Sequence, residues 1–150
     1  LKITPIAHAC HPSSKDAYYV YEVCRDLKVP LMIHTGNGIP FADPTSVYKG
    51  AADHPDVPVI LAHAGSESFN QQARILAAKL DNVFLEPSWC GTNAVKHMIE
   101  EVGCDKILFS SDNFDQIPVE LAKYRQIIKN EDDLEKVMWK NAVRIFDLKL

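Results

Sequence analysis

Short apolar runs alternate along the chain with longer stretches in which apolar residues recur every three to four positions. Short runs of aliphatic and β-branched residues are typical of buried strands, whereas the longer periodicity indicates amphipathic helices. The pattern predicts strands at 1–6, 29–33, 57–62, 83–86 and 107–110. It predicts helices at 15–27, 45–52, 66–80, 92–102, 118–129 and 132–146. Strands and helices therefore alternate over the whole sequence.

Turn and capping residues separate these elements. Asp43 followed by Pro44 is typical of a helix start, because the carboxylate caps free amides and proline suits the first helical position. A flexible loop is predicted over 36–40. Gly103 is suited to end the helix predicted over 92–102. No linker or low-complexity tract interrupts the series.

The order of the elements predicts a parallel α/β fold. Strands joined by helices form repeated βαβ units, and strands that are apolar throughout are covered on both faces. A chain of 150 residues with 47% hydrophobic content can bury one core, which favours a single domain over 1–150. Five strands are fewer than the eight of a closed barrel. Since the sequence opens at Leu1 directly in a strand, we expect a piece of a longer protein.

Three of the predicted strands end in a polar side chain that can bind metal or move protons. His34 follows the second strand, His63 the third and Asp112 the fifth. The carboxyl ends of parallel strands lie at one edge of a sheet, so these residues are expected to converge there. A single histidine after a strand is more often a hydrogen-bonded structural residue. Three such groups at three strand ends favour a shared site.

The residue types at these strand ends indicate metal chemistry. Imidazole nitrogen and carboxylate oxygen are standard ligands of zinc and other divalent first-row ions. A bound metal lowers the pKa of its water and polarises a carbonyl or carboxylate, while a nearby histidine without a metal bond moves protons. We expect Lys2, from the first strand, and Glu86, at the end of the fourth, to contact the substrate at the same edge.

Four segments resemble, in their order and spacing, the motifs of the amidohydrolase-related (amidohydrolase 2) metal-dependent hydrolases. This family includes the aminocarboxymuconate-semialdehyde decarboxylase-like enzymes. The segments are 33–36 (IHTG), 61–65 (LAHAG), 107–112 (ILFSSD) and 141–148 (NAVRIFDL). Residues 2–5 (KITP) resemble the family's fourth-strand segment, although Thr4 stands where histidine is common. The resemblance covers essentially the whole chain.

The resemblance implies a partial (β/α)8 TIM barrel, to which residues 1–150 would supply strands four to eight as its carboxyl-terminal portion. It implies that His34 is a metal ligand and that Asp112 binds the metal or takes the proton of its water. It implies that His63 ligates a second metal or acts as an acid or base. The implied cofactor is one divalent ion, zinc or else manganese. The family's first-strand ligand pair has no counterpart here, so we expect this piece alone to bind metal weakly or not at all.

The other histidines and the cysteines have simpler interpretations. His8 and His11 lie past a strand end and are not expected to bind metal, and His54, in a turn before a strand, is expected at the surface. Four widely spaced cysteines without a Cys-x-x-Cys motif are expected to be reduced and mostly buried. Cys90 is the thiol expected to be nearest a substrate, because it follows a strand end.

Charge and hydropathy exclude several classes of partner. A net charge of −4 and an isoelectric point near 5.8 give no general attraction to nucleic acid or anionic lipid. No apolar stretch reaches the roughly 18 residues that a membrane span requires. We therefore expect a cytoplasmic protein with a small-molecule substrate and no nucleic-acid or membrane partner.

The sequence leaves two functions open. The first is a metal enzyme that hydrolyses a C–N or C–O bond or decarboxylates a small carboxylic acid, with His34 and Asp112 holding the metal and His63 moving protons. The second is a catalytically inactive partial barrel, a fragment or self-associating module whose open sheet edges are covered by a partner. That partner would be a second copy of the chain or the missing amino-terminal half of the barrel.

Overall fold

The computed structural model describes residues 1–38 and 41–149, so Ile39 and Pro40 of the predicted loop lie outside the described residues. Its strands are β1 (Lys2–Ile3), β2 (Leu31–His34), β3 (Val59–Ala62) and β4 (Val83–Glu86). Its α-helices are α1 (Lys15–Leu27), α2 (Tyr48–Asp53), α3 (Ser66–Lys79), α4 (Thr92–Val102), α5 (Ile117–Ile127), α6 (Glu131–Glu135) and α7 (Asn141–Ile145). A π-helical turn (Lys136–Lys140) joins α6 to α7, and 3-10 turns occupy Pro44–Val47, His63–Gly65, Cys104–Lys106 and Phe114–Gln116.

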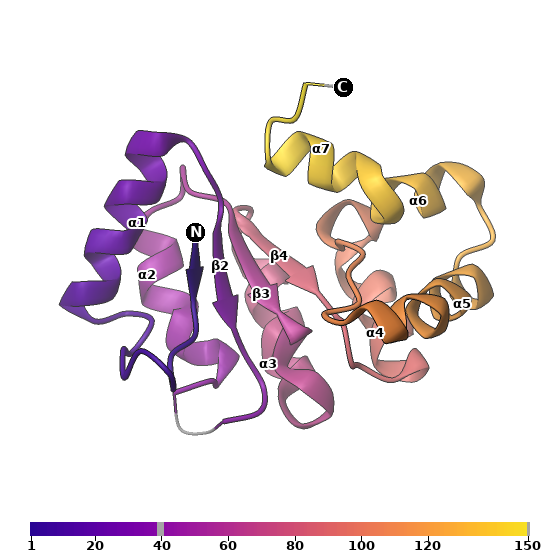
Figure 1. Cartoon of the computed structure of the whole chain (residues 1–150), viewed down its shortest axis with the longest axis horizontal. Helices are drawn as coiled ribbons and strands as arrows, with labels where there is room; N and C mark the ends of the chain where they lie inside the picture. The colour runs from indigo at the N-terminus through magenta and orange to yellow at the C-terminus, as the bar shows by residue number, and fades with distance from the viewer. Residues whose placement is uncertain (39–40, 150) are drawn as a thin grey trace.

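The strands form one parallel sheet in the order β1-β2-β3-β4 (Figure 1). The register pairs Ile3 with Ile33, Ile33 with Leu61 and Leu61 with Leu85. Each connection returns the chain to the start of the next strand, so the carboxyl ends of all four strands lie at the same edge. The arrangement is that of consecutive units of a (β/α)8 barrel, as predicted.

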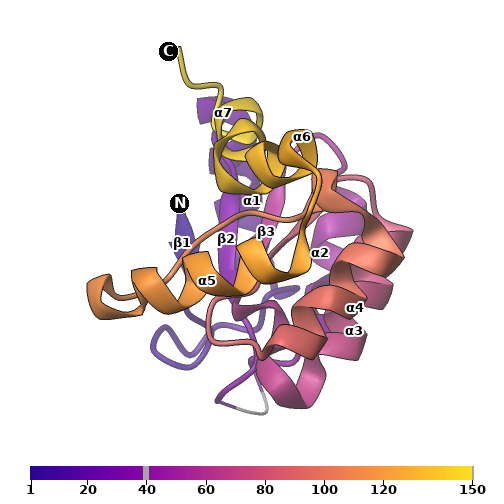
Figure 2. The same ribbon diagram turned by 90° about the vertical axis from the view of Figure 1, so that its right-hand side faces the viewer.

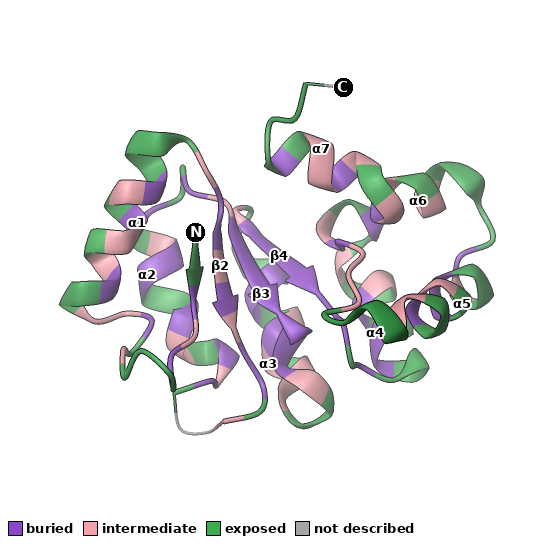
Figure 3. Cartoon of the chain, viewed as in Figure 1, coloured by how far each residue is buried: buried purple, intermediate pink, exposed green. Residues whose placement is uncertain are grey.

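The two faces of the sheet are covered differently, because side chains alternate between the faces along each strand. One face, with Leu61 and Leu85, forms the main core with α1 to α4. Figure 2 shows α3 and α4 together on one side of the strands. On the other face Ile60 and Phe84 pack against Ile145 at the end of α7. β3 and β4 are therefore buried along their whole length (Figure 3).

The predicted fifth strand is reduced to one isolated bridge, between Ile107 and Leu85. The amide of Leu108 donates to the carbonyl of Leu85 at 2.9 Å, but the amide of Phe109 donates to the carbonyl of Val137 at 2.9 Å. Successive amides of an extended chain point to opposite sides, so the Phe109 bond lies on the side away from β4 and holds this segment against the π-helical turn before α7.

Other boundaries also differ from the prediction. β1 ends at Ile3 because the amide of Thr4 donates to Nδ1 of His8 at 3.2 Å, which starts a turn. The helix predicted over 132–146 is present but contains the π-helical turn. The capping role of Asp43 is confirmed, since its Oδ1 accepts the amide of Thr45 at 2.8 Å.

The prediction that His54 lies at the surface is wrong. The residue is 6% exposed, and its ring stacks on the ring of Tyr21 with 4.8 Å between the centroids. Its Nδ1 donates to the carbonyl of Gly50 at 2.8 Å. α1 covers the turn after α2, a long-range contact that the local sequence does not reveal.

The cysteines are free thiols, three of them buried, as predicted. Among the described residues, none of the helices combines the length and the hydropathy that crossing a bilayer requires.

Asn141→Ala should destabilise the fold through the bridge segment. Nδ2 of this residue, which is 2% exposed, donates to the carbonyls of Cys104 at 2.7 Å and Ile107 at 2.8 Å. Removing the donor leaves the carbonyl of Ile107 without this bond and the carbonyl of Cys104 with only the amide of Ile107, so we expect a loss of about 2–3 kcal/mol in the free energy of unfolding, measured in urea. Asn130→Ala, which removes the exposed cap of α6, serves as control and should cost only about 1 kcal/mol. Equal losses of unfolding free energy in the two variants would contradict the role of Asn141 in holding the segment from Cys104 to Ile107.

Candidate active site

A small cavity opens at the carboxyl edge of the sheet. It has a volume of about 180 Å³ and is lined by His34, Asn37, His63, Ser66, Trp89 and Asp112. The ring centroids of the two histidines lie 4.9 Å apart. The structure thus brings together the three side chains at the predicted strand ends, while their chemical roles stay predictions.

His34 is the last residue of β2, and its Nε2 donates to the carbonyl of Asn37 at 2.8 Å. The next residue, Thr35, is fully buried and ties the loops after β2 and β3 together. Its hydroxyl donates to the carbonyl of Ala62 at 2.8 Å and accepts the amide of Gly65 at 2.9 Å. The imidazole of His34 is therefore presented from a rigid strand end.

His63 directly follows β3 and is 8% exposed. Its Nδ1 lies 2.9 Å from the hydroxyl oxygen of Ser88. In the tautomer that donates from Nδ1, Nε2 keeps the lone pair that accepts a proton. Burial lowers the pKa of His63, and the neighbouring His34 lowers it further, while Asp112 opposes the shift. The ring is therefore neutral near pH 7 and suited to act as a base or ligand.

Glu86 ends β4 beneath the His63 loop and is 4% exposed. Its Oε2 accepts the amide of His63 at 3.2 Å, and its Oε1 accepts the amide of Ser88 at 2.8 Å. Burial raises the pKa of Glu86 to about 7, although these hydrogen bonds oppose the shift. Glu86 does not line the cavity, and both of its carboxylate oxygens accept backbone amides, so its predicted contact with substrate stays a prediction.

Asp112 lies on the exposed loop between the Ile107 bridge and α5. Its Oδ2 accepts the indole N–H of Trp89 at 3.0 Å, which leaves Oδ1 as the oxygen that could bind a metal ion. Trp89 is half-exposed at the mouth of the cavity. One hydrogen bond from an aromatic side chain therefore orients the carboxylate.

Four residues that line the cavity adopt left-handed backbone conformations. The φ angles are +62° at His63, +53° at Ser66, +67° at Trp89 and +60° at Asp112. Each costs of order 1–3 kcal/mol for a residue with a side chain, and such strain is concentrated at functional sites. Gly36, with φ of +103°, has no room for a side chain, because a Cβ there would lie 2.8 Å from Cβ of Ser66.

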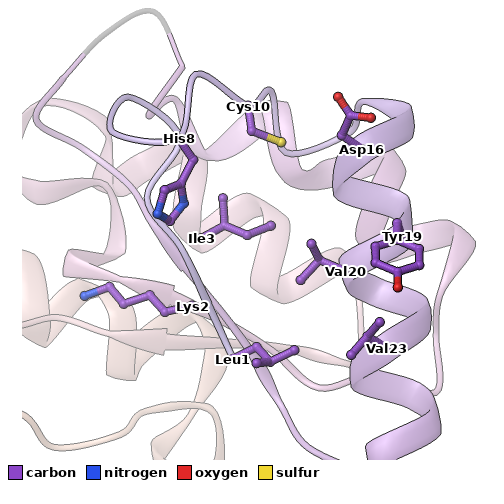
Figure 4. A pocket seen from close by; sticks show the side chains of 9 residues that line it. All are labelled: Leu1, Lys2, Ile3, His8, Cys10, Asp16, Tyr19, Val20 and Val23. Carbon is purple, nitrogen blue, oxygen red and sulfur yellow. The ribbon is translucent and has the colours of Figure 1, made fainter.

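Lys2 lies on the face of the sheet that also presents His34, but it does not line the cavity. Figure 4 shows its side chain directed away from Ile3, Val20 and Val23, which line a groove between β1 and α1. The Lys2 charge contributes to the lowered pKa of His63. Its predicted contact with substrate stays a prediction.

The donor set suits a divalent ion in its chemistry, since two imidazoles and a carboxylate line one cavity. Each ring has one nitrogen in a hydrogen bond, which fixes its orientation and leaves the second nitrogen for a ligand. Among residues 1–38 and 41–149, however, no group of three His, Cys, Asp or Glu side chains is arranged to hold a metal. The chemistry of these three side chains fits a divalent ion, but their positions in the described residues do not form a complete set of metal ligands.

The sequence as a whole matches a known protein family. The family profile described as amidohydrolase matches residues 2–148. The chain belongs to the amidohydrolase family. The resemblance drawn from the strand-end motifs is therefore confirmed. Comparison with curated proteins gives no match.

Solved structures share the fold of this amidohydrolase chain. An uncharacterised TIM-barrel protein from Bordetella bronchiseptica is 21% identical, with a TM-score of 0.78 over 96% of this chain and 56% of that chain. A 2,6-dihydroxybenzoate decarboxylase complexed with 2,6-dihydroxybenzoate is 20% identical, with a TM-score of 0.72 over 93% and 57%. A dihydroxybenzoic acid decarboxylase from Polaromonas with bound manganese and the inhibitor 2-nitroresorcinol is 18% identical, with a TM-score of 0.68 over 93% and 56%.

These similarities confirm the predicted fold class, a partial TIM barrel. The amidohydrolase chain spans a little over half the length of the structures that it matches.

Sequence reasoning missed the hydrogen-bond partners in the site, above all Ser88 beside His63 and Trp89 beside Asp112. Their position just after a strand end was the available signal. The prediction that Cys90 meets the substrate is not supported by its position. Cys90 is 2% exposed, and its thiol donates to the carbonyl of His63 at 3.3 Å. Burial raises its pKa to about 12, so the thiol stays protonated.

Glu86→Gln should change how stability depends on pH. The pKa of Glu86 rises from 4.5 in the unfolded chain to about 7 in the fold, so between these values the folded chain holds a proton that the unfolded chain releases. Stability contributed by this residue is therefore present below pH 4.5 and lost as pH rises to about 7. Glutamine does not titrate, so the difference in unfolding free energy between wild type and variant should shift by roughly 3 kcal/mol over that window. Parallel pH profiles in urea titrations would contradict the assignment.

Proposed function

We propose that the amidohydrolase chain is the carboxyl-terminal part of a metal-dependent enzyme that hydrolyses a C–N or C–O bond or decarboxylates a small carboxylic acid. The observation that supports this proposal is the meeting of His34, His63 and Asp112 in one cavity. The match to the family profile over residues 2–148 gives that cavity its enzymatic context.

His34 and Asp112 would hold one divalent ion, either zinc or manganese. Manganese is the metal bound in the similar Polaromonas decarboxylase. A bound ion would polarise a substrate oxygen and lower the pKa of its water. Two protein ligands hold an ion weakly, so the intact protein would have to add further ligands from outside residues 1–150.

His63 would move the proton of the reaction at Nε2. Its ring is neutral because burial lowers its pKa, and Ser88 holds the other nitrogen. In hydrolysis Nε2 would take the proton of the attacking water. In decarboxylation Nε2 would first take up a proton from solvent and then deliver it to the carbon atom that loses carbon dioxide. Either role requires a fixed ring, which the Ser88 hydrogen bond supplies.

Decarboxylation is the branch that we favour. Two of the similar structures are decarboxylases of dihydroxybenzoates. The half-exposed indole of Trp89 would offer a flat apolar wall to a small aromatic acid. Lys2 would attract the carboxylate of such a substrate from the same face of the sheet.

His34→Ala in the intact protein should abolish both metal binding and turnover. We expect manganese affinity to fall by about 100-fold or more in equilibrium dialysis, because a direct ligand is lost. Carbon dioxide release from hydroxybenzoates and hydrolysis of amides and esters should be assayed side by side to separate the two reactions. His97→Ala, on the exposed surface of α4, is the matched control and should retain metal. Full metal occupancy in His34→Ala would sink the proposal.

A second candidate function, self-association, is favoured by the free edge of β1. This strand pairs with β2, and no described strand pairs with its other edge. Beside it lies an apolar groove of about 410 Å³, in which Ile3 faces Val20 and Val23 of α1 (Figure 4). Unpaired strand edges next to apolar surface favour association with another chain.

Val23→Lys tests this candidate, because it places a charge in the groove. We expect the isolated chain to dimerise as its concentration rises in sedimentation velocity and the variant to stay monomeric. Glu22→Lys, at the neighbouring exposed position of α1, changes charge without entering the groove and should leave association intact. A chain that is monomeric at every concentration would rule out self-association.

A further inference from the structure

The loop over 87–91 supplies both of the side chains that orient the proposed catalytic groups. Ser88 holds Nδ1 of His63, and the indole of Trp89 holds Oδ2 of Asp112. Trp89 keeps a left-handed backbone, with φ of +67°, which a residue with a side chain adopts only when its surroundings enforce it. Something beneath the loop must therefore supply that constraint.

A buried ion pair on α5 lies directly under this loop. Glu120 is 3% exposed and Lys123 is 8% exposed. Nζ of Lys123 donates to Oε2 of Glu120 at 2.6 Å. The two residues are three positions apart on the helix, so both point to the same side of it.

Each member of the pair also binds the backbone of the loop. Oε1 of Glu120 accepts the amide of Trp89 at 3.3 Å, and Nζ of Lys123 donates to the carbonyl of Cys90 at 2.6 Å. The pair thus binds the peptide group before Trp89 and the peptide group after Cys90, so its two contacts span the left-handed Trp89. α5 begins a few residues after Asp112, so one helix constrains both ends of the Trp89–Asp112 hydrogen bond.

We propose that Glu120 and Lys123 are positioning residues that orient Asp112 through the backbone of Trp89. Neither side chain lines the cavity, so both act only through the loop. The proposal rests on the proposed function for its consequence in metal binding, but the positioning itself is a property of the loop. Loss of the pair frees Trp89 from its left-handed conformation and withdraws the indole from Asp112.

A purely stabilising role makes a different prediction. Replacing a buried ion pair with apolar residues of similar volume is often neutral or stabilising, because the desolvation cost of the charges disappears. The double variant Glu120→Met with Lys123→Met should therefore remain folded, with a thermal midpoint within about 10 °C of wild type, because the lost bonds to the Trp89 amide and the Cys90 carbonyl offset part of that gain. It nevertheless removes both hydrogen bonds to the loop backbone. The variant therefore distinguishes a positioning role of the pair from a stabilising one.

The order of the loop can be measured without any activity. The chain has two tryptophans, so Trp139→Phe leaves Trp89 as the single tryptophan, whose emission can be excited selectively over that of the tyrosines. In this background we expect acrylamide quenching of Trp89 to rise about twofold in the double variant, because a constrained, half-exposed indole becomes mobile. The matched control removes the Arg74–Glu101 pair between α3 and α4, by Arg74→Met with Glu101→Met, and should leave quenching unchanged.

The link to Asp112 is measured with manganese alone in the intact protein. We expect the double variant to bind manganese 10- to 100-fold more weakly, as is usual when a group that orients a ligand is lost. Trp89→Phe removes the indole N–H and should lose as much. Adding it to the double variant should cost nothing further, because both changes break one chain of contacts.

Each outcome decides a separate point. Unchanged quenching in the folded double variant overturns the positioning role. Raised quenching with unchanged manganese affinity, or additive losses with Trp89→Phe, overturns the link to Asp112. A wild-type protein that binds no manganese refutes the proposed function instead, and the quenching result still decides whether the pair positions the loop. Should the double variant not fold, Glu120→Gln gives the same readouts with a smaller change of shape.

Discussion

The carboxylate of Glu86 holds the carboxyl edge of the sheet in one arrangement. Its two oxygens accept the amides of His63 and Ser88, at 3.2 and 2.8 Å, so one buried group fixes both an imidazole and the hydroxyl that orients it. Burying a carboxylate costs several kcal/mol unless hydrogen bonds replace its water. The raised pKa of Glu86 records the part of that cost which the two amides do not offset. The positions of the His63 backbone and of Ser88 beside its ring depend on this contact.

The parts of the fold that the sequence predicted are those set by local pattern. Apolar runs located β2, β3 and β4 to within two residues, because a strand buried on both faces is apolar throughout. The pattern could not predict that the fifth strand is reduced to one bridge, or that the amide of Phe109 donates to the carbonyl of Val137, since that acceptor is 28 positions away. The burial of His54 under α1 was hidden for the same reason, because it depends on Tyr21.

The candidate site also contains residues that local pattern predicts and residues that it does not. His34, His63 and Asp112 were predictable because parallel strands bring their carboxyl ends to one edge. Their partners were not, since Ser88 and Trp89 act through loop geometry that composition does not encode. Glu86 shows what the strand-end rule leaves open. The rule places this residue at the end of β4, but it does not reveal that both carboxylate oxygens accept backbone amides.

The groups around the cavity differ in how firmly they are held, and the difference explains why a buried ion pair lies nearby. His63 is buried and bound through its ring and its own amide, whereas Asp112 is exposed and held through one indole. A buried pair such as Glu120–Lys123 contributes little net stability, because desolvation of its charges offsets their attraction. Stability alone therefore gives a weak reason for its place under Trp89. A loop with a strained backbone needs fixed partners of its own, and charged groups supply short, directional hydrogen bonds where packing alone would let the loop relax.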